Sequence, residues 1–220
     1  MSALTGLASL ILSFILSVAY GAYYARKAES FARMLCKTSS ILLLAVFAAL
    51  FAAPVVLVAA LLASATGDFF LSRTGTRNFL AGMAAFFLAH VAYIGLFAQL
   101  GGTFEVLLDR WMWAVMLIFA AMAMASWLSP KLGKLKVPVL AYIVVICAMG
   151  LAALALPVHA GHLMVMGGAA AFIISDAVLS IELFVLSCGA RSLRVTPYIV
   201  WTFYWSAQVL IVLGVLGAPV

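Results

Sequence analysis

The chain has 220 residues, of which 68% are hydrophobic and only 8% are charged. A soluble domain averages about 25% charged residues, so this chain lacks the polar residues needed to cover a water-exposed surface. Its net charge of +6 does not indicate nucleic-acid binding, because the basic residues lie in short links between apolar runs, as membrane topology requires. The composition predicts an all-α integral membrane protein with one transmembrane domain over residues 1–220.

Apolar runs long enough to cross a bilayer recur along the chain, since a crossing needs about 20 residues. Eight are predicted, at about 4–24, 37–53, 54–72, 78–100, 110–129, 136–156, 160–186 and 197–217. The second and third are nearly continuous, but residues 40–72 as one helix would measure about 50 Å. Pro54 offers a break, because proline is favoured in the first turn of a helix. The start lacks a basic segment and a cleavage site, so we expect a retained helix rather than a signal peptide.

The basic residues favour this eight-helix bundle. With eight crossings, the odd-numbered links hold eleven of the twelve Lys and Arg residues, and only Arg110 lies elsewhere. The positive-inside rule makes these links cytoplasmic, so both termini are expected to be non-cytoplasmic. Short loops and the lack of a targeting signal suit a bacterial inner membrane.

Two aspartates are predicted within the membrane. Asp68 ends the third run in SATGDFFLS, and Asp176 lies in the seventh run in FIISDAVLS. At 1.5 Å per residue they lie about 21 and 24 Å from the outer ends of their runs, and therefore at one level in the cytoplasmic half. Ionisable groups in a bilayer are costly and mark a functional site or a pairing. The simpler alternative is that each aspartate only bonds a neighbouring helix.

Serines one helical turn away accompany both aspartates on the same face. Ser64 and Ser72 flank Asp68, and Ser180 follows Asp176. Both segments also read D-x-x-L-S, which suggests a 4+4 pseudo-repeat, with two four-helix halves related by an axis along the membrane normal.

Other polar residues are candidates for the same pocket. Tyr204 and Gln208 form an i, i+4 pair, and each can orient a substrate or bond a neighbouring helix. Lys37 is expected to open the second run, where it binds a phosphate, pairs with an aspartate or snorkels to the surface. His90 lies mid-span, where a buried histidine bonded to a neighbour is the commoner outcome than a catalytic one. Glu182 is expected in solvent near the cytoplasmic headgroups.

A metal site is not favoured by the histidines. His159 and His162, in HAGH, lie in an outer link, whereas a zinc site needs at least three converging ligands. The sequence contains no G-x-S-x-G, H-E-x-x-H or Gly-rich phosphate loop. No cofactor is expected.

Several segments stand in the order typical of one membrane-protein family. They are GDFFLS at Gly67–Ser72, NFLAGMAAFFLAHVAYIGLF at Asn78–Phe97, SDAVLSIELF at Ser175–Phe184 and YWSAQVLIVLG at Tyr204–Gly214, with Lys37 before them. The chain thus resembles the YhhN family of lysoplasmalogenase-like membrane proteins. Thr38 departs from the pattern, which has a proline there.

The resemblance implies hydrolysis of the vinyl ether bond of a lysoplasmalogen, yielding a fatty aldehyde and a glycerophospho-ethanolamine or glycerophospho-choline. It carries the acidic positions to Asp68 and Asp176. Two carboxyls close together in low dielectric do not both ionise easily. We therefore expect one protonated acid and one ionised partner that stabilises an oxocarbenium ion, as in glycosidases. The expected substrate-binding residues are Lys37, Asn78, His90, Tyr204, Gln208, Ser72 and Ser180.

The lipid itself is expected to meet basic and aromatic residues. Arg73 or Arg77 would reach the phosphate, and the alkyl chain would lie among phenylalanines. These are Phe69, Phe70, Phe86 and Phe87. The expected partners are the lysophospholipid and the bilayer, with no nucleic acid and no obligatory protein partner.

Three alternatives remain at this point. A lipid or small-solute transporter would use the same aspartates for proton coupling. A metal-dependent lipid hydrolase would use His90, His159 and His162. A structural scaffold would use none of these residues.

Overall fold

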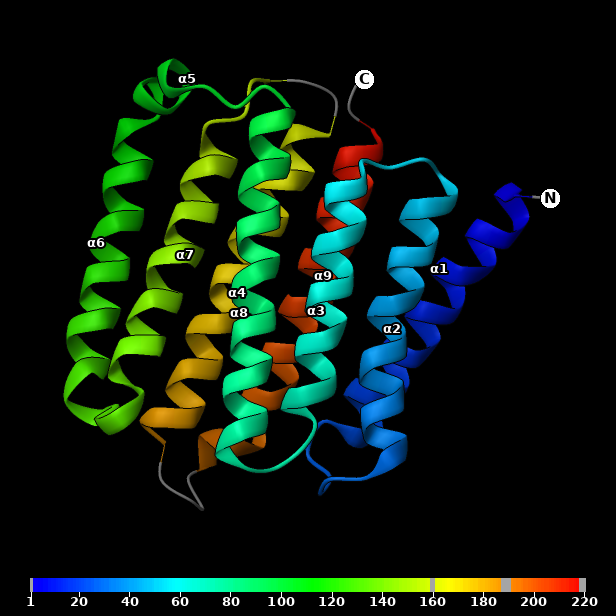
Figure 1. Cartoon of the computed structure of the whole chain (residues 1–220), viewed down its shortest axis with the longest axis vertical. Coiled ribbons are helices and arrows are strands. Elements are labelled where there is room, and N and C mark those ends of the chain that lie inside the picture. Colours follow the sequence, from blue (N-terminus) through cyan, green and yellow to red (C-terminus); the bar gives the residue numbers. More distant parts are fainter. Residues whose placement is uncertain (1, 159–160, 187–190, 218–220) are drawn as a thin grey trace.

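The computed structural model describes residues 2–158, 161–186 and 191–217. These residues are helical almost throughout and form no strand. The α-helices, labelled in Figure 1, are α1 (Ser2–Ala19), α2 (Phe31–Leu50), α3 (Val55–Leu71), α4 (Thr76–Gln99), α5 (Phe104–Asp109), α6 (Trp111–Leu128), α7 (Lys136–Leu154), α8 (His162–Phe184) and α9 (Thr196–Leu216). Short π- or 3₁₀-helical turns adjoin them at Tyr20–Tyr24, Ser129–Lys131, Gly133–Leu135 and Arg191–Arg194.

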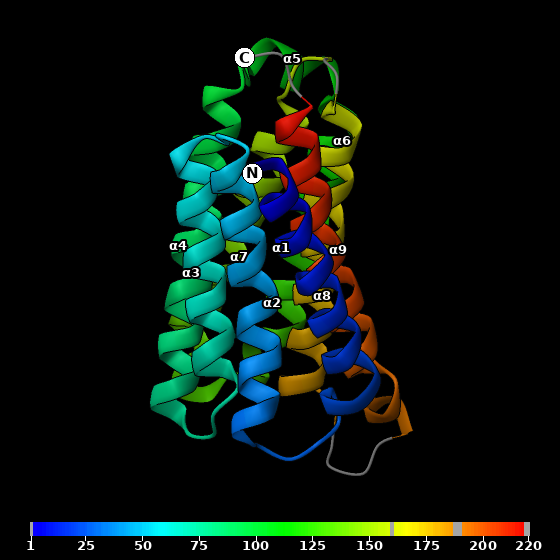
Figure 2. The same ribbon diagram turned by 90° about the vertical axis from the view of Figure 1, so that its right-hand side faces the viewer.

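The long helices form a single bundle, with α1 and α6 at its two edges and α3, α4, α8 and α9 between them (Figures 1 and 2). The most extensive packing is between α3 and α4 and between α8 and α9. The basic links that follow α1, α3 and α6 lie at the lower end in Figure 1. We call this the basic end of the bundle.

The predicted runs match the described helices to within a few residues, with α2 as the main exception. α2 begins at Phe31, six residues before the predicted start at Lys37. Ser30 caps it, since its Oγ accepts a hydrogen bond from the Arg33 amide. Lys37 therefore lies inside the helix and does not open it. The predicted break at Pro54 is present, with Pro54 as the N-cap of α3.

One described helix was not predicted. The short α5 lies between α4 and α6, on the end opposite the basic links (Figure 1). The Thr103 hydroxyl caps it by accepting a hydrogen bond from the Val106 amide. α5 has only six residues. A search for apolar runs of membrane-spanning length therefore does not detect it.

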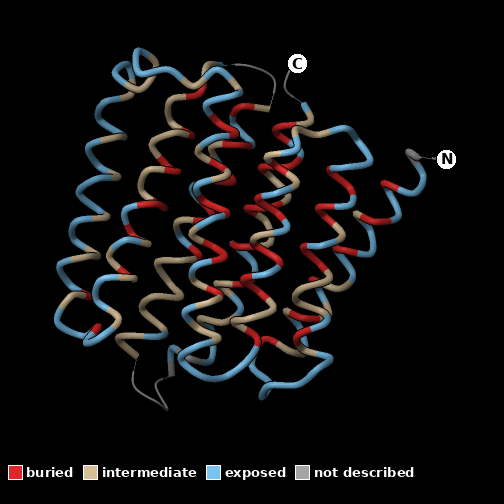
Figure 3. The backbone as a smooth tube through the Cα atoms, in the orientation of Figure 1, coloured by how far each residue is buried: buried red, intermediate tan, exposed pale blue. Residues whose placement is uncertain are grey.

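Seven described helices are long and apolar enough to cross a membrane, and α3, with 17 residues, is shorter. The edge helix α6 exposes large apolar side chains, including Trp113 (62%) and Phe119 (65%). In Figure 3 the buried residues gather on the inner helices, whereas α6 is largely exposed. An apolar surface of this extent suits contact with lipid rather than water. The fold is that of a multi-pass membrane protein.

Gly168 allows α8 and α9 to pack closely. A Cβ atom at Gly168 would lie 2.9 Å from the Ala207 carbonyl oxygen, whereas a Cβ at Gly167 would meet no described atom within 4 Å. We expect Gly168→Ala to destabilise the bundle by about 1–3 kcal/mol through overpacking. Gly167→Ala is the matched control and should be neutral or stabilising, since Ala is the better helix former. Thermal unfolding in detergent measures both, and equal melting temperatures would contradict the close contact.

Candidate active site

A cavity of about 650 Å³ opens at the basic end of the bundle. Helices α2, α3, α4, α7, α8 and α9 all contribute to its wall. Both membrane aspartates line it, so the sequence-based prediction that they share one pocket is consistent with the structure. The charged side chains that line the cavity are Arg33, Lys37, Asp68, Arg73, Asp176 and Glu182.

Asp68 lies in the last turn of α3 on an inward face. Ser64, Asp68 and Ser72 follow at four-residue spacing and all are buried, as expected for a polar stripe that faces the bundle interior. Lys37 Nζ lies 3.0 Å from Asp68 Oδ1. The Tyr204 hydroxyl donates a 2.7 Å hydrogen bond to Oδ2. The Asp68 side chain has no exposed surface, so α2 and α9 together enclose it.

Lys37 thus forms the aspartate pair that the sequence left as one of three alternatives. Its position inside α2, rather than at the start of the helix, directs the ammonium group into the bundle. The Lys37 side chain is 16% exposed and lines the cavity. The ammonium group supplies the counter-charge that an ionised carboxylate needs in a low-dielectric interior.

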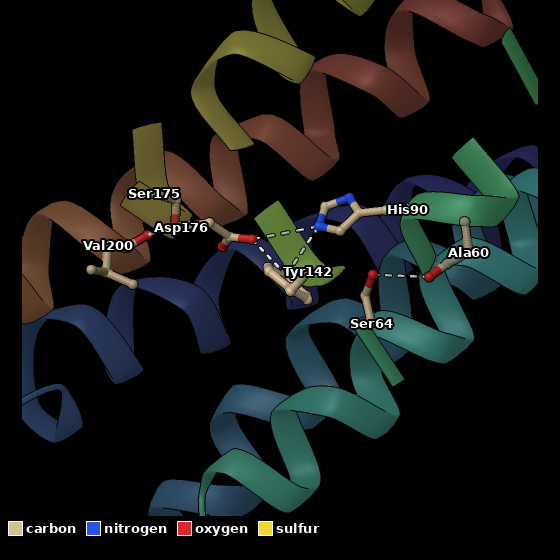
Figure 4. A network of polar contacts seen from close by, with 7 residues as sticks. All are labelled: Ala60, Ser64, His90, Tyr142, Ser175, Asp176 and Val200. Atoms are coloured by element: carbon tan, nitrogen blue, oxygen red, sulfur yellow. Dashed lines mark hydrogen bonds and ion pairs between the residues drawn. The ribbon is translucent and has the colours of Figure 1, made fainter. Parts of the chain in front are cut away.

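Asp176 lies within α8 and has a different set of partners, drawn in Figure 4. The Tyr142 hydroxyl, from α7, donates a 2.6 Å hydrogen bond to Asp176 Oδ2. His90 Nε2, from α4, lies 3.0 Å from the Tyr142 oxygen and 3.4 Å from Asp176 Oδ2. The Asp176 side chain is 13% exposed and lines the cavity. Asp176 is therefore the more accessible of the two carboxyls.

The surroundings of His90 favour one tautomer. Its Nδ1 atom is buried and has no hydrogen-bond partner among the described residues. Buried N–H groups without an acceptor are rarer than buried acceptors without a donor, so the proton belongs on Nε2. Nε2–H then donates to the Tyr142 oxygen, and the Tyr142 hydroxyl donates to Asp176. These three residues form a hydrogen-bond chain that ends on the carboxyl.

The ring of Phe172 packs between the two aspartate networks. Its centroid lies 5.4 Å from that of Tyr204, which bonds Asp68, and 4.7 Å from that of His90, which contacts Asp176. Phe86 also packs against Tyr204, with centroids 5.6 Å apart. Apolar rings in this position keep water away from the inner wall and strengthen the polar contacts beside them.

Other predicted site residues are distributed unevenly around the cavity. Ser180 lines it. Ser72 is buried beside Asp68, with its hydroxyl unbonded among the described residues. Gln208 lies deeper in the bundle and accepts a hydrogen bond from the Tyr93 hydroxyl. Asn78 lies outside the lining, in the first turn of α4, where its Nδ2 donates to the Thr74 carbonyl oxygen.

Of the residues predicted to contact the lipid, some line the cavity and others do not. Arg73 lines the cavity and Arg77 does not. Of the four phenylalanines predicted around the alkyl chain, Phe86 alone lines it. Glu182, expected in solvent, is half-buried at the cavity wall, in the last turn of α8, where Phe184 packs against Phe79 of α4.

Tyr142 is the main residue that sequence reasoning missed. It stands in an apolar stretch, KVPVLAYIVVICAMG, where a tyrosine is indistinguishable from packing residues. The one available signal was its phenol, since buried tyrosine hydroxyls usually find a hydrogen-bond partner. A search for acceptors at matching depth would have pointed to Asp176.

His90 and His162, the two described histidines among those considered for a metal site, do not converge. His90 belongs to the Asp176 network, whereas His162 lies 3.5 Å from Arg110 in the other half of the bundle. His159 lies outside the described residues. Among the residues that are described, no group of three His, Cys, Asp or Glu side chains could hold a metal ion.

Comparison with models of known protein families gives one match that covers most of the chain. The YhhN family model matches residues 32–215. The chain belongs to the YhhN family. The match spans the described helices from α2 to α9 and includes every residue of the two aspartate networks. The resemblance noted from the sequence is thereby confirmed.

Two curated relatives of this YhhN protein are each called "Lysoplasmalogenase", one from Mycobacterium bovis and one from Mycobacterium tuberculosis. Each is 36% identical over 161 residues, which cover 72% of this chain and 59% of the relative. The matched region thus spans about three fifths of the length of these relatives. No solved structure matches the chain.

Proposed function

We propose that this protein hydrolyses the vinyl ether bond of lysoplasmalogens, releasing a fatty aldehyde and a glycerophospho-alcohol. Its family and the names of two relatives support the reaction class. The observation that carries the proposal is that Asp68 and Asp176 line one cavity while having different partners. Different partners allow one carboxyl to be ionised while the other is protonated.

In this proposal Asp176 is the acid and Asp68 is the ionised partner. Asp68 has the Lys37 ammonium as its counter-charge. Its Oδ1 forms the ion pair with Lys37, and its Oδ2 accepts a hydrogen bond from the Tyr204 hydroxyl. Asp176 has no such cation fixed beside it, and its side chain is the one with exposed surface. A proton donor must reach the reacting atom, so the more accessible carboxyl suits that role.

The proposed reaction begins with transfer of the Asp176 proton to the β-carbon of the vinyl ether. The carbon–carbon double bond supplies the electron pair, and the α-carbon and ether oxygen share the resulting positive charge. The negative charge of Asp68 stabilises this oxocarbenium ion. Water adds to the α-carbon and returns a proton to Asp176. The hemiacetal then breaks its bond to the glycerol oxygen, which takes the hydroxyl proton, and the aldehyde leaves.

The lipid phosphate is proposed to bind at the mouth of the cavity. Because Lys37 is paired with Asp68, Arg33 and Arg73 are the cations that remain among the described residues of the lining. The Arg73 guanidinium lies over the ring of Phe69, 4.1 Å from its centroid, and this contact holds the side chain near the cavity. Arginine suits phosphate because its guanidinium can donate two parallel hydrogen bonds.

We also propose that α3 is an eighth crossing, in one transmembrane bundle. It runs beside α4 through the bundle (Figure 1), and its 17 residues span about 26 Å. Eight crossings gather the basic links on one side, which the positive-inside rule makes cytoplasmic. The start of α1 and the end of α9 are then non-cytoplasmic. The membrane proposed is the bacterial inner membrane.

A 4+4 pseudo-repeat is supported by the partners of the two aspartates. Under the exchange of α2 with α7, α3 with α8 and α4 with α9, Asp68 on α3 corresponds to Asp176 on α8. Asp68 is bonded from α2 and α9, and Asp176 from α7 and α4. This is the pattern that a pseudo-twofold axis along the membrane normal would produce. Lys37 and Tyr142 even share one position, six residues after the first residue of their helices.

The reaction is tested with purified protein in detergent. We expect aldehyde release from a lysoplasmalogen and none from the saturated-ether analogue, since only the vinyl ether accepts a proton at carbon. A transporter would need sealed vesicles and a gradient, and would release no aldehyde in detergent. Absence of aldehyde from the vinyl ether substrate would refute the proposed hydrolysis.

A further inference from the structure

Glu182 lines the cavity but takes no part in either aspartate network. Its Oε2 atom is buried and has no hydrogen-bond partner among the described residues. The other two acidic residues of the lining both have partners, namely Lys37 and Tyr204 for Asp68 and Tyr142 and His90 for Asp176. A buried carboxylate oxygen without a donor costs free energy. With respect to the described part of the chain, Glu182 therefore has an unused capacity to bind a cation or a hydrogen-bond donor.

The position of Glu182 relates it to the reacting bond. It follows Asp176 on α8 by six residues toward the basic end, which corresponds to an axial rise of about 9 Å. Phe79 and Phe184 pack edge to face, with centroids 6.2 Å apart, and line the same cavity as Glu182. Glu182 thus lies on α8 between the proposed acid and the basic end of the bundle, in a cavity that aromatic rings also line.

We propose that Glu182 binds the ammonium group of the substrate head group, and that it makes the enzyme prefer head groups that carry an amine. This rests on the proposed function. In an ethanolamine lysoplasmalogen about nine bonds separate the vinyl ether oxygen from the nitrogen, or roughly 11 Å when extended, for bond lengths near 1.5 Å. The axial rise of about 9 Å along α8 from Asp176 to Glu182 lies within that reach.

The charges around the mouth of the cavity complement a zwitterionic head group. Arg33 and Arg73 come from α2 and the α3–α4 link, whereas Glu182 comes from α8. When the arginines bind the phosphate, the positively charged amine can reach Glu182 in the wall of the same cavity. The aromatic rings of Phe79 and Phe184 can add cation–π attraction for a methylated ammonium.

The inference is tested by ligand binding, which does not require turnover. The probes are a 1-O-alkyl glycerophosphoethanolamine and the matching 1-O-alkyl glycerophosphate, both saturated ethers that the proposed reaction does not cleave. Titration calorimetry in detergent should give tighter binding of the ethanolamine lipid by wild type. Glu182→Gln should weaken that binding about tenfold, as for loss of one charge-assisted hydrogen bond, and leave glycerophosphate binding unchanged or tighter.

Glu105→Gln is the matched control, because Glu105 is exposed on α5 at the opposite end of the bundle, and it should retain the wild-type preference. Equal weakening of both lipids by Glu182→Gln, an unchanged preference, or no binding of either lipid to wild type would overturn the inference. Aldehyde release from a lysoplasmalogen is measured on the same samples. A preserved, Glu182-dependent preference without aldehyde release would refute the proposed reaction and keep the ammonium site.

Discussion

Asp176→Asn is expected to lower the rate of aldehyde release from a lysoplasmalogen about a thousandfold. The substitution preserves the shape of the side chain and an oxygen that can accept from the Tyr142 hydroxyl, but it removes the acidic proton. General acid catalysis typically contributes 10² to 10⁴-fold, so the loss should fall within that range. Initial rates at saturating substrate, measured on protein in detergent, give the ratio directly.

The fold should survive this change. The Asp176 side chain is partly exposed to the cavity, and no Lys or Arg among the described residues forms an ion pair with it, so its neutralisation leaves no buried cation unpaired. Asp109→Asn, at an exposed position at the end of α5, is the control and should retain the full rate. If Asp176→Asn hydrolyses the vinyl ether as fast as wild type, Asp176 is not the proton donor.

The positions of the helices could be predicted from the sequence because a lipid bilayer restricts which segments can cross it. Every crossing needs a long apolar run, and such runs are visible without knowledge of tertiary contacts. Pro54 shows the same point on a smaller scale, since the break it predicts is the one observed between α2 and α3. The start of α2 was missed because a single capping hydroxyl, Ser30, sets it, and because Arg33 and Lys37 interrupt the apolar run in its first two turns.

The aspartates could also be predicted, but their partners could not. A carboxylate in a bilayer is rare enough to be noticed alone, and counting residues gives its depth. The choice of partner depends on how helices rotate and pack, which distant segments decide together. Tyr142 has the composition of its apolar surroundings, and Lys37 reads equally well as a topology residue. His90 and Gln208 were recognised as polar, yet their different partners, Asp176 and Tyr93, follow only from the packed bundle.

Asp68→Asn is expected to lower stability as well as activity. The Lys37 ammonium lies 3.0 Å from Asp68 Oδ1, and the Lys37 side chain is only 16% exposed, so neutralising Asp68 strands a largely buried charge. Removing one partner of a buried ion pair costs about 3–5 kcal/mol. We expect a loss near 3 kcal/mol, at the lower end, because Lys37 retains some contact with the cavity. Chemical or thermal unfolding in detergent measures the change.

The double variant Lys37→Met/Asp68→Asn separates the structural role of Asp68 from its catalytic role. With both charges removed, no ion is left unpaired, so most of the stability lost in Asp68→Asn should return. Aldehyde release should stay low, because the negative charge that stabilises the oxocarbenium ion is still absent. A double variant that recovers the wild-type rate together with its stability would mean that Asp68 only holds the helices together. A stable bundle with a rate still reduced at least a hundredfold would assign Asp68 to the chemistry.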